Sequence, residues 1–200
     1  MENEKQIEQY FKEIKEICNN ISREDIDEVI EILFDAWKNG NQVFLCGNGG
    51  SASTATHFTC DLFKVTIVEG KKRMRALCLN DNIPLMTALI NDDGWDNLFI
   101  EQLKNLYQKG DVIMCFSVHG GAGQDKAGAW SQNLLKAMDY VKKNGGKTIG
   151  FAGFDGGAMK ELADVCVVVP FDATPHVEAF HVVLQHLIAF RLKEKIMEYK

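Results

Sequence analysis

Four side chains suited to proton transfer or metal binding occur as two pairs at helical spacing. His57 and Asp61 are four residues apart, so one helix face would carry both, where they could share a metal ion or bracket one substrate. Glu178 and His186 are eight residues apart and also stay near one helix face. Taken singly, each histidine could instead be a hydrogen-bonded buried residue, and Asp61 a solvated carboxylate.

A glycine-rich turn precedes the first pair. Residues 43–46 are an apolar run of strand length, 47–51 read GNGGS, and 52–62 read as a helix. Glycines let the backbone approach a ligand closely, and the exposed amides of such a turn suit an anion or a polar sugar. A dinucleotide fingerprint needs an acidic residue at the end of the second strand, about 20 residues after the glycines. Glu69 has about that spacing but lies before the strand, and Asp81, which follows the strand, comes too late, so this fingerprint is excluded. With this turn beside them, the two pairs together favour a functional site.

The elements that must position these residues alternate between strand and helix patterns. Continuously apolar strands separated by helices are typical of a parallel sheet that is buried on both faces. We therefore predict an α/β fold: a three-layer, doubly wound, five-stranded parallel sheet, with ligands at the carboxyl ends of the strands. The predicted strands are 43–46, 76–79, 112–117, 148–151 and 165–169.

Two amphipathic helices precede the sheet. Apolar residues at helical spacing fill 7–17 and 26–37, Ser22 and Asp25 form a capping pair between them, and Asn39-Gly40 ends the second helix. A helical hairpin is expected over 1–40 and the sheet with its covering helices over 41–200, as one domain of 1–200. No repeat or linker divides the chain.

Composition excludes several classes of protein. The net charge of -6 opposes binding to nucleic acid, and no apolar segment is long enough to span a membrane. The six cysteines lack paired metal spacing, and most lie in apolar runs, as reduced thiols do. The expectation is a cytoplasmic protein that contacts neither nucleic acid nor membrane.

The motif set resembles the phosphoheptose isomerases of the sugar-isomerase (SIS) superfamily. It comprises CGNGGSASTATHFTCDL, NDDGWDNLF, VIMCFS, KTIGFAGFDGGAMKELADVCVVVP and a terminal HxxxxH. The resemblance implies the five-stranded fold with its N-terminal hairpin and a homotetramer whose active sites lie between subunits. It also implies conversion of a phosphorylated ketose, sedoheptulose 7-phosphate, into an aldose phosphate, with zinc in the site of some members.

The same resemblance assigns roles to the two pairs. It gives Asp61 as the base that takes the proton from carbon and His186 as the acid that protonates oxygen, and it makes His57, Asp61, Glu178 and His186 the metal ligands. Asp61 replaces a family Glu and Glu178 a family Gln. Two histidines with two carboxylates favour a divalent cation, so zinc is a candidate cofactor. Glu178 is an alternative base, with Asp61 then a ligand. His181 is expected to pack in the core.

The resemblance also implies a set of sugar-binding and phosphate-binding residues. In the family's phosphate loop, two hydroxyl residues have become Val118 and His119, and about ten residues are inserted before Ser131, which is expected to cap the next helix. The Asn-Asp loop could contact sugar hydroxyls or be a plain turn. The substrate-binding candidates are Asn48, Gly49, Gly50, Ser51, Asp92, Ser117, His119, Gly120 and Ser131.

Two other functions compete with an isomerase. A non-catalytic phosphosugar-binding protein, acting as a regulator or scaffold tetramer, fits the altered phosphate loop, but it would need no acid-base pair. Metal-assisted hydrolysis would need a metal-bound water. Self-association is expected because Phe180, Leu184, Leu187 and Phe190 offer more apolar surface than one sheet face covers.

Overall fold

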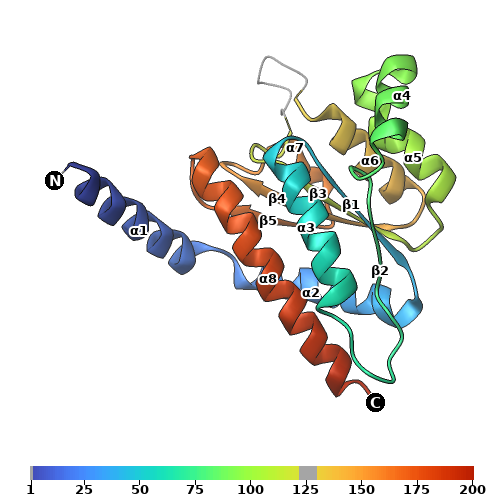
Figure 1. The fold of residues 1–200 in the computed structure, drawn as a ribbon, viewed down its shortest axis with the longest axis horizontal. Helices are drawn as coiled ribbons and strands as arrows, with labels where there is room; N and C mark the ends of the chain where they lie inside the picture. The colour runs from blue at the N-terminus through green and yellow to red at the C-terminus, as the bar shows by residue number, and fades with distance from the viewer. Residues whose placement is uncertain (1, 122–129) are drawn as a thin grey trace.

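A five-stranded sheet lies at the centre of the computed structural model, which describes residues 2–121 and 130–200 (Figure 1). All neighbouring strands are parallel, in the order β2-β1-β3-β4-β5, so the chain reverses its winding direction between β1 and β3. The predicted α/β fold and all five strands are confirmed. The strands are β1 (Gln42–Gly47), β2 (Arg75–Cys78), β3 (Val112–Phe116), β4 (Lys147–Gly153) and β5 (Val165–Val169).

Helices cover both faces of the sheet (Figure 1). Before β1 come α1 (Glu2–Asn20) and α2 (Arg23–Asn39). The others are α3 (Gly50–Lys64), α4 (Ile83–Asp93), the 3-10 helix η1 (Trp95–Asn97), α5 (Leu98–Leu106), α6 (Gln132–Lys143), α7 (Gly157–Leu162) and α8 (Thr174–Glu198). No helix within 2–121 or 130–200 is long and apolar enough to cross a membrane.

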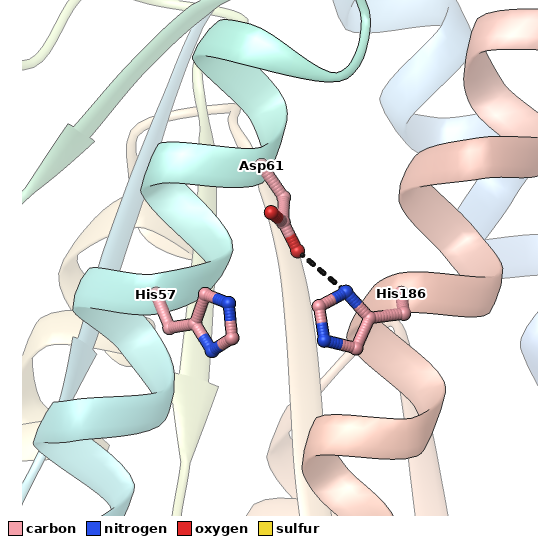
Figure 2. Close-up of side chains that lie close together, drawn as sticks. All are labelled: His57, Asp61 and His186. Atoms are coloured by element: carbon pink, nitrogen blue, oxygen red, sulfur yellow. Dashed lines mark ion pairs between the residues drawn. The ribbon is translucent and has the colours of Figure 1, made fainter.

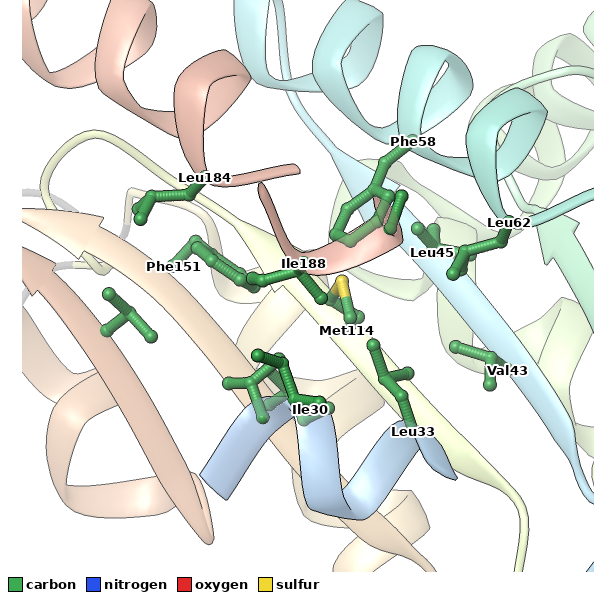
Figure 3. Close-up of a cluster of buried hydrophobic side chains, with 14 of the residues drawn as sticks. Ile30, Leu33, Val43, Leu45, Phe58, Leu62, Met114, Phe151, Leu184 and Ile188 are labelled. Carbon is green, nitrogen blue, oxygen red and sulfur yellow. The ribbon is translucent and has the colours of Figure 1, made fainter. Parts of the chain in front are cut away.

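Alternate residues of β1, β3, β4 and β5 lie in two different cores, whereas β2 buries only one face. Val43 and Leu45 pack with α2, α3 and α8, as Figure 3 shows, whereas Phe44 and Cys46 pack with α5, α6 and α7 on the other face. This alternation follows from the two-residue period of a strand. Because both faces are apolar and covered, the polar groups of a site are confined to the strand ends and the outer helix faces.

The two N-terminal helices form where they were predicted. The Ser22 side chain accepts a hydrogen bond from the Asp25 backbone N–H (3.1 Å), and Gly40 ends α2 with φ of 74°. The arrangement differs from a closed hairpin, because α1 projects away from the sheet instead of folding back along α2 (Figure 1). Near its middle, α1 is held by Tyr10, whose ring lies 4.4 Å from that of the buried His176.

Candidate active site

The glycine-rich turn joins β1 to α3 and is held by two asparagines from other segments. Asn80, just after β2, accepts a hydrogen bond from the Gly47 N–H (3.1 Å) and donates one to its carbonyl (3.0 Å). Asn133 of α6 and Asn48 exchange two side-chain hydrogen bonds (3.0 and 2.9 Å). A side chain at Gly47 would lie 2.4 Å from the Ser51 carbonyl oxygen, so the tight turn requires glycine there.

Sequence reasoning did not identify either asparagine. Asn133 is fully buried although it begins a helix, and Asn80 follows a short strand. Both satisfy partly buried polar groups of the turn. The side-chain amide of Asn48 is therefore engaged with Asn133, and the exposed glycines Gly49 and Gly50 are the open part of the turn. Ser51 is buried at 3% exposure.

The first predicted pair and His186 converge between α3 and α8, as Figure 2 shows. His57 and Asp61 extend from one face of α3, and ligand atoms of the two and of His186 all lie within 4.8 Å of one another. Asp61 Oδ2 lies 3.0 Å from His186 Nδ1, and the His57 and His186 rings are 5.0 Å apart. The Asp61 side chain is 10% exposed and that of His186 46%, so a buried carboxylate orients an exposed imidazole.

Gln185 is a further member of this cluster that the sequence analysis missed. It is fully buried on α8, and its Nε2 donates to Asp61 Oδ2 (3.4 Å). Its Oε1 has no hydrogen-bond partner in the part of the chain that the structure describes. The only available signal was a glutamine within the apolar run of the last helix, next to His186.

Glu178 lies apart from the other three, so the structure brings together three of the four proposed metal ligands. Its carboxylate lies against Gly50 at the start of α3, with Oε1 2.3 Å from where a Cβ at that position would be. Glu178, Gly50 and His57 line one surface pocket of about 400 Å³. Glu178 makes no hydrogen bond or ion pair with any residue of 2–121 or 130–200. Its carboxylate faces the pocket.

The donor set of His57, Asp61 and His186 fits a metal ion of the zinc type. Two imidazoles and one carboxylate are a common set of protein ligands for catalytic zinc, which leaves a position open for substrate. The second carboxylate, Glu178, lines the same pocket as His57. The three ligand side chains come from two helices that pack along each other, so their positions are set by rigid elements.

The residues carried over from the family's phosphate loop gather at the ends of β3 and β4. Ser117 Oγ and Ser131 Oγ are 3.4 Å apart, and the His119 ring lies 4.3 Å from that of Phe154. Gly120 packs against Gly156, whose carbonyl oxygen would be 1.9 Å from a Cβ at 120. The inserted segment 122–129 lies outside the described residues.

Two details of these predictions need correction. Ser131 precedes α6 but does not cap it: its backbone is left-handed (φ 57°) and its side chain makes no capping hydrogen bond. Asp92 is not in a loop but on the exposed last turn of α4, where it accepts a hydrogen bond from Asn91 (2.7 Å). The apolar run 83–90 continues the helix into these polar residues, and Gly94 ends it.

Comparison with known proteins identifies the family. The SIS domain model matches residues 9–153. The lincomycin biosynthesis protein LmbN of Streptomyces lincolnensis is 43% identical over 162 residues, which cover 79% of this chain and 58% of that protein. This chain thus spans little more than half of that relative.

Two phosphoheptose isomerases match over most of their length. The phosphoheptose isomerase of a Nitratiruptor species is 37% identical over 166 residues, 82% of each chain. A phosphoheptose isomerase structure from Francisella tularensis has the same fold, with a TM-score of 0.84 at 24% identity over 97% of this chain and 100% of that one. The chain therefore belongs to the SIS domain family and, within it, to the phosphoheptose isomerases.

Proposed function

We propose that the protein is an aldose-ketose isomerase acting on a phosphorylated sugar of the sedoheptulose 7-phosphate type. Two observations support this proposal: the contact between Asp61 and His186, and the carboxylate of Glu178, which faces a pocket at the glycine turn. Isomerisation needs a base that reaches a carbon-bound proton and an acid that serves the oxygens of the enediolate. The relatives named phosphoheptose isomerases support the same reaction.

The contacts favour Glu178 as the base. Asp61 Oδ2 already pairs with His186 Nδ1 and accepts a hydrogen bond from Gln185, and with a metal bound Asp61 would be a ligand, so in both cases its carboxylate is occupied. Glu178 has no such partner and faces the pocket. Glu178 takes the proton from C1 of the ketose and returns it to C2, while His186 moves the proton between the two oxygens.

Asp61 then acts as the positioning residue for His186. By pairing with Nδ1, Asp61 leaves Nε2 of the exposed imidazole free to accept and donate the oxygen-bound proton. In a zinc-bound form, His57, Asp61 and His186 would hold the ion, which would polarise the carbonyl oxygen as a Lewis acid in place of proton transfer by His186. The glycine turn with Ser51, and the Ser117 and Ser131 hydroxyls, bind the sugar and its phosphate.

An assay on sedoheptulose 7-phosphate tests the proposal. The wild-type protein, prepared without chelator and analysed for zinc, should form the aldose phosphate and incorporate solvent deuterium at C2. Glu178→Gln keeps the size of the side chain but removes the base, and it should lower kcat by at least about 100-fold. Tight binding without turnover in the wild type would instead favour a non-catalytic phosphosugar-binding protein.

We also infer a homotetramer with active sites between subunits, in the cytoplasm. The apolar helix α4 has no buried residue, and Ile83, Leu187 and Phe190 are 60%, 48% and 57% exposed. Such surface favours burial against another copy of the chain. All six cysteines are free, as in a reducing compartment. Native mass spectrometry should give four chains, and Phe190→Asp should yield smaller species.

A further inference from the structure

Three aromatic rings from distant segments meet at the carboxyl edge of the sheet. His119 follows β3, Trp130 precedes α6 and Phe154 follows β4. The His119 ring centre lies 4.3 Å from that of Phe154 and 5.6 Å from that of Trp130. Trp130 is 59% exposed, an unusual position for so large an aromatic side chain. We call these three residues the aromatic wall.

The backbone around the aromatic wall is held in an uncommon conformation. Phe154 and Ser131, which follows Trp130, have φ of 54° and 57°, and they are the only non-glycine residues with positive φ within 2–121 and 130–200. Each such residue costs about 1 kcal/mol or more, and strain of this kind persists where the surroundings fix it, often at ligand sites. Both residues flank the same three rings.

Close backbone packing keeps the aromatic wall in place. The Gly153 N–H donates to the Val118 carbonyl (2.9 Å) and the Met159 N–H to that of Gly120 (2.8 Å). At Gly157 a Cβ would lie 2.3 Å from the His119 carbonyl oxygen, so the turn after β4 rests directly on the segment after β3. The backbone that carries the His119 and Phe154 rings is therefore fixed before any ligand binds, which lowers the entropy cost of binding.

The aromatic wall belongs to the same edge as the proposed active site. Ser131 adjoins Trp130, and its Oγ lies 3.4 Å from that of Ser117. Two residues further, Asn133 exchanges two hydrogen bonds with Asn48 of the glycine turn. Since β1, β3 and β4 are successive neighbours about 4.8 Å apart, the wall lies roughly 10 Å across the sheet edge from that turn.

We propose that His119, Trp130 and Phe154 bind the carbon skeleton of the phosphorylated sugar by stacking, with the Ser117 and Ser131 hydroxyls binding oxygens beside it. A sugar presents C–H groups on one side and hydroxyls on another, so rings next to a hydroxyl pair match it in both respects. The inference rests on the proposed function and adds that this end of the site recognises the sugar itself, not only its phosphate.

Calorimetric titration with sedoheptulose 7-phosphate and with inorganic phosphate tests the wall. A Glu178→Gln background prevents turnover. Trp130→Ala should weaken sugar-phosphate binding by about three- to tenfold, the effect of losing one aromatic contact, and leave phosphate binding unchanged. His119→Phe keeps a ring without the imidazole and should bind both ligands as the parent does. Trp95→Ala, which removes another exposed tryptophan (47%), is the matched control and should change neither affinity.

The possible outcomes distinguish failure of the stacking proposal from failure of the proposed isomerase activity. Equal sugar-phosphate affinities for the Trp130→Ala and Trp95→Ala variants would contradict stacking of the sugar on the aromatic wall. An equal loss of phosphate and sugar-phosphate affinity in Trp130→Ala would contradict it as well. A loss of phosphate affinity in His119→Phe would make His119 an anion ligand and overturn its stacking role. If wild-type protein turns nothing over while Trp130→Ala still weakens sugar binding, the proposed isomerase fails and the wall stands.

Discussion

Two of the three histidines of helix α8, His181 and His186, lie five residues apart in opposite environments. His181 is fully buried; its Nε2–H donates to the Ala152 carbonyl (3.2 Å), and burial lowers its pKa to about 4. The side chain of His186 is 46% exposed and lies 3.0 Å from the Asp61 carboxylate. His181 therefore stays neutral and structural, as predicted, while His186 is available for proton transfer. Residue type alone distinguishes neither role; the neighbouring groups do.

Replacing His186 should give the largest effect. His186→Asn removes the proton carrier on an exposed helix face, so kcat should fall about 100-fold or more. The free energy of unfolding should change by less than about 0.5 kcal/mol, because the site is exposed. Turnover assays with urea unfolding check both. A loss of stability without a loss of kcat would reverse the assigned roles.

His181 should instead govern how stability depends on pH. The unfolded imidazole binds a proton near pH 6.5 and the folded one near pH 4, so stability is complete above pH 6.5 and falls between 6.5 and 4. The loss should reach up to about 3 kcal/mol. Urea unfolding across this range, compared with His181→Gln, isolates the contribution from that of the carboxylates. Parallel pH curves for the two proteins would contradict it.

A substitution at Gly50 that changes kcat through Glu178 gives a smaller effect. Gly50→Ala would place a Cβ 2.3 Å from Glu178 Oε1 and displace that flexible carboxylate. We expect kcat to fall about tenfold, since small misplacement of a base is costly, with little change in stability. In a Glu178→Ala background the same change should have no further effect on kcat. Additive losses in the double variant would argue against Glu178 as the base.

The cysteines show the same contrast between buried and exposed groups. Of the changes considered, their chemical modification should affect activity least. Burial raises the pKa of Cys166 to about 12 and that of Cys78 to about 11, whereas Cys18 and Cys60 are exposed. A thiol reagent should label Cys18 and Cys60 quickly and the other four only on unfolding, with activity retained. Mass spectrometry of labelled peptides checks this; fast labelling of Cys46 or Cys115 would show that the sheet opens.

Much of the fold could be predicted from local pattern. The strands at 43–46 and 112–117 were placed to within a residue or two, because continuous apolar runs between helices have few alternatives. The Ser22 cap and the Gly40 terminus follow from local chemistry. The direction of α1 could not be predicted, since it depends on contacts such as that of Tyr10 with His176, which are distant in sequence.

The candidate site shows the same division. Helical spacing, a local property, was enough to place His57 and Asp61 on one helix face. Long-range packing established that His186 reaches Asp61 while Glu178 lies at Gly50, and that Gln185, Asn80 and Asn133 complete the site. The Gln185–Asp61 contact, for example, joins residues 124 positions apart in the sequence. The geometry of these contacts is set by how helices pack on the sheet, which no local pattern encodes.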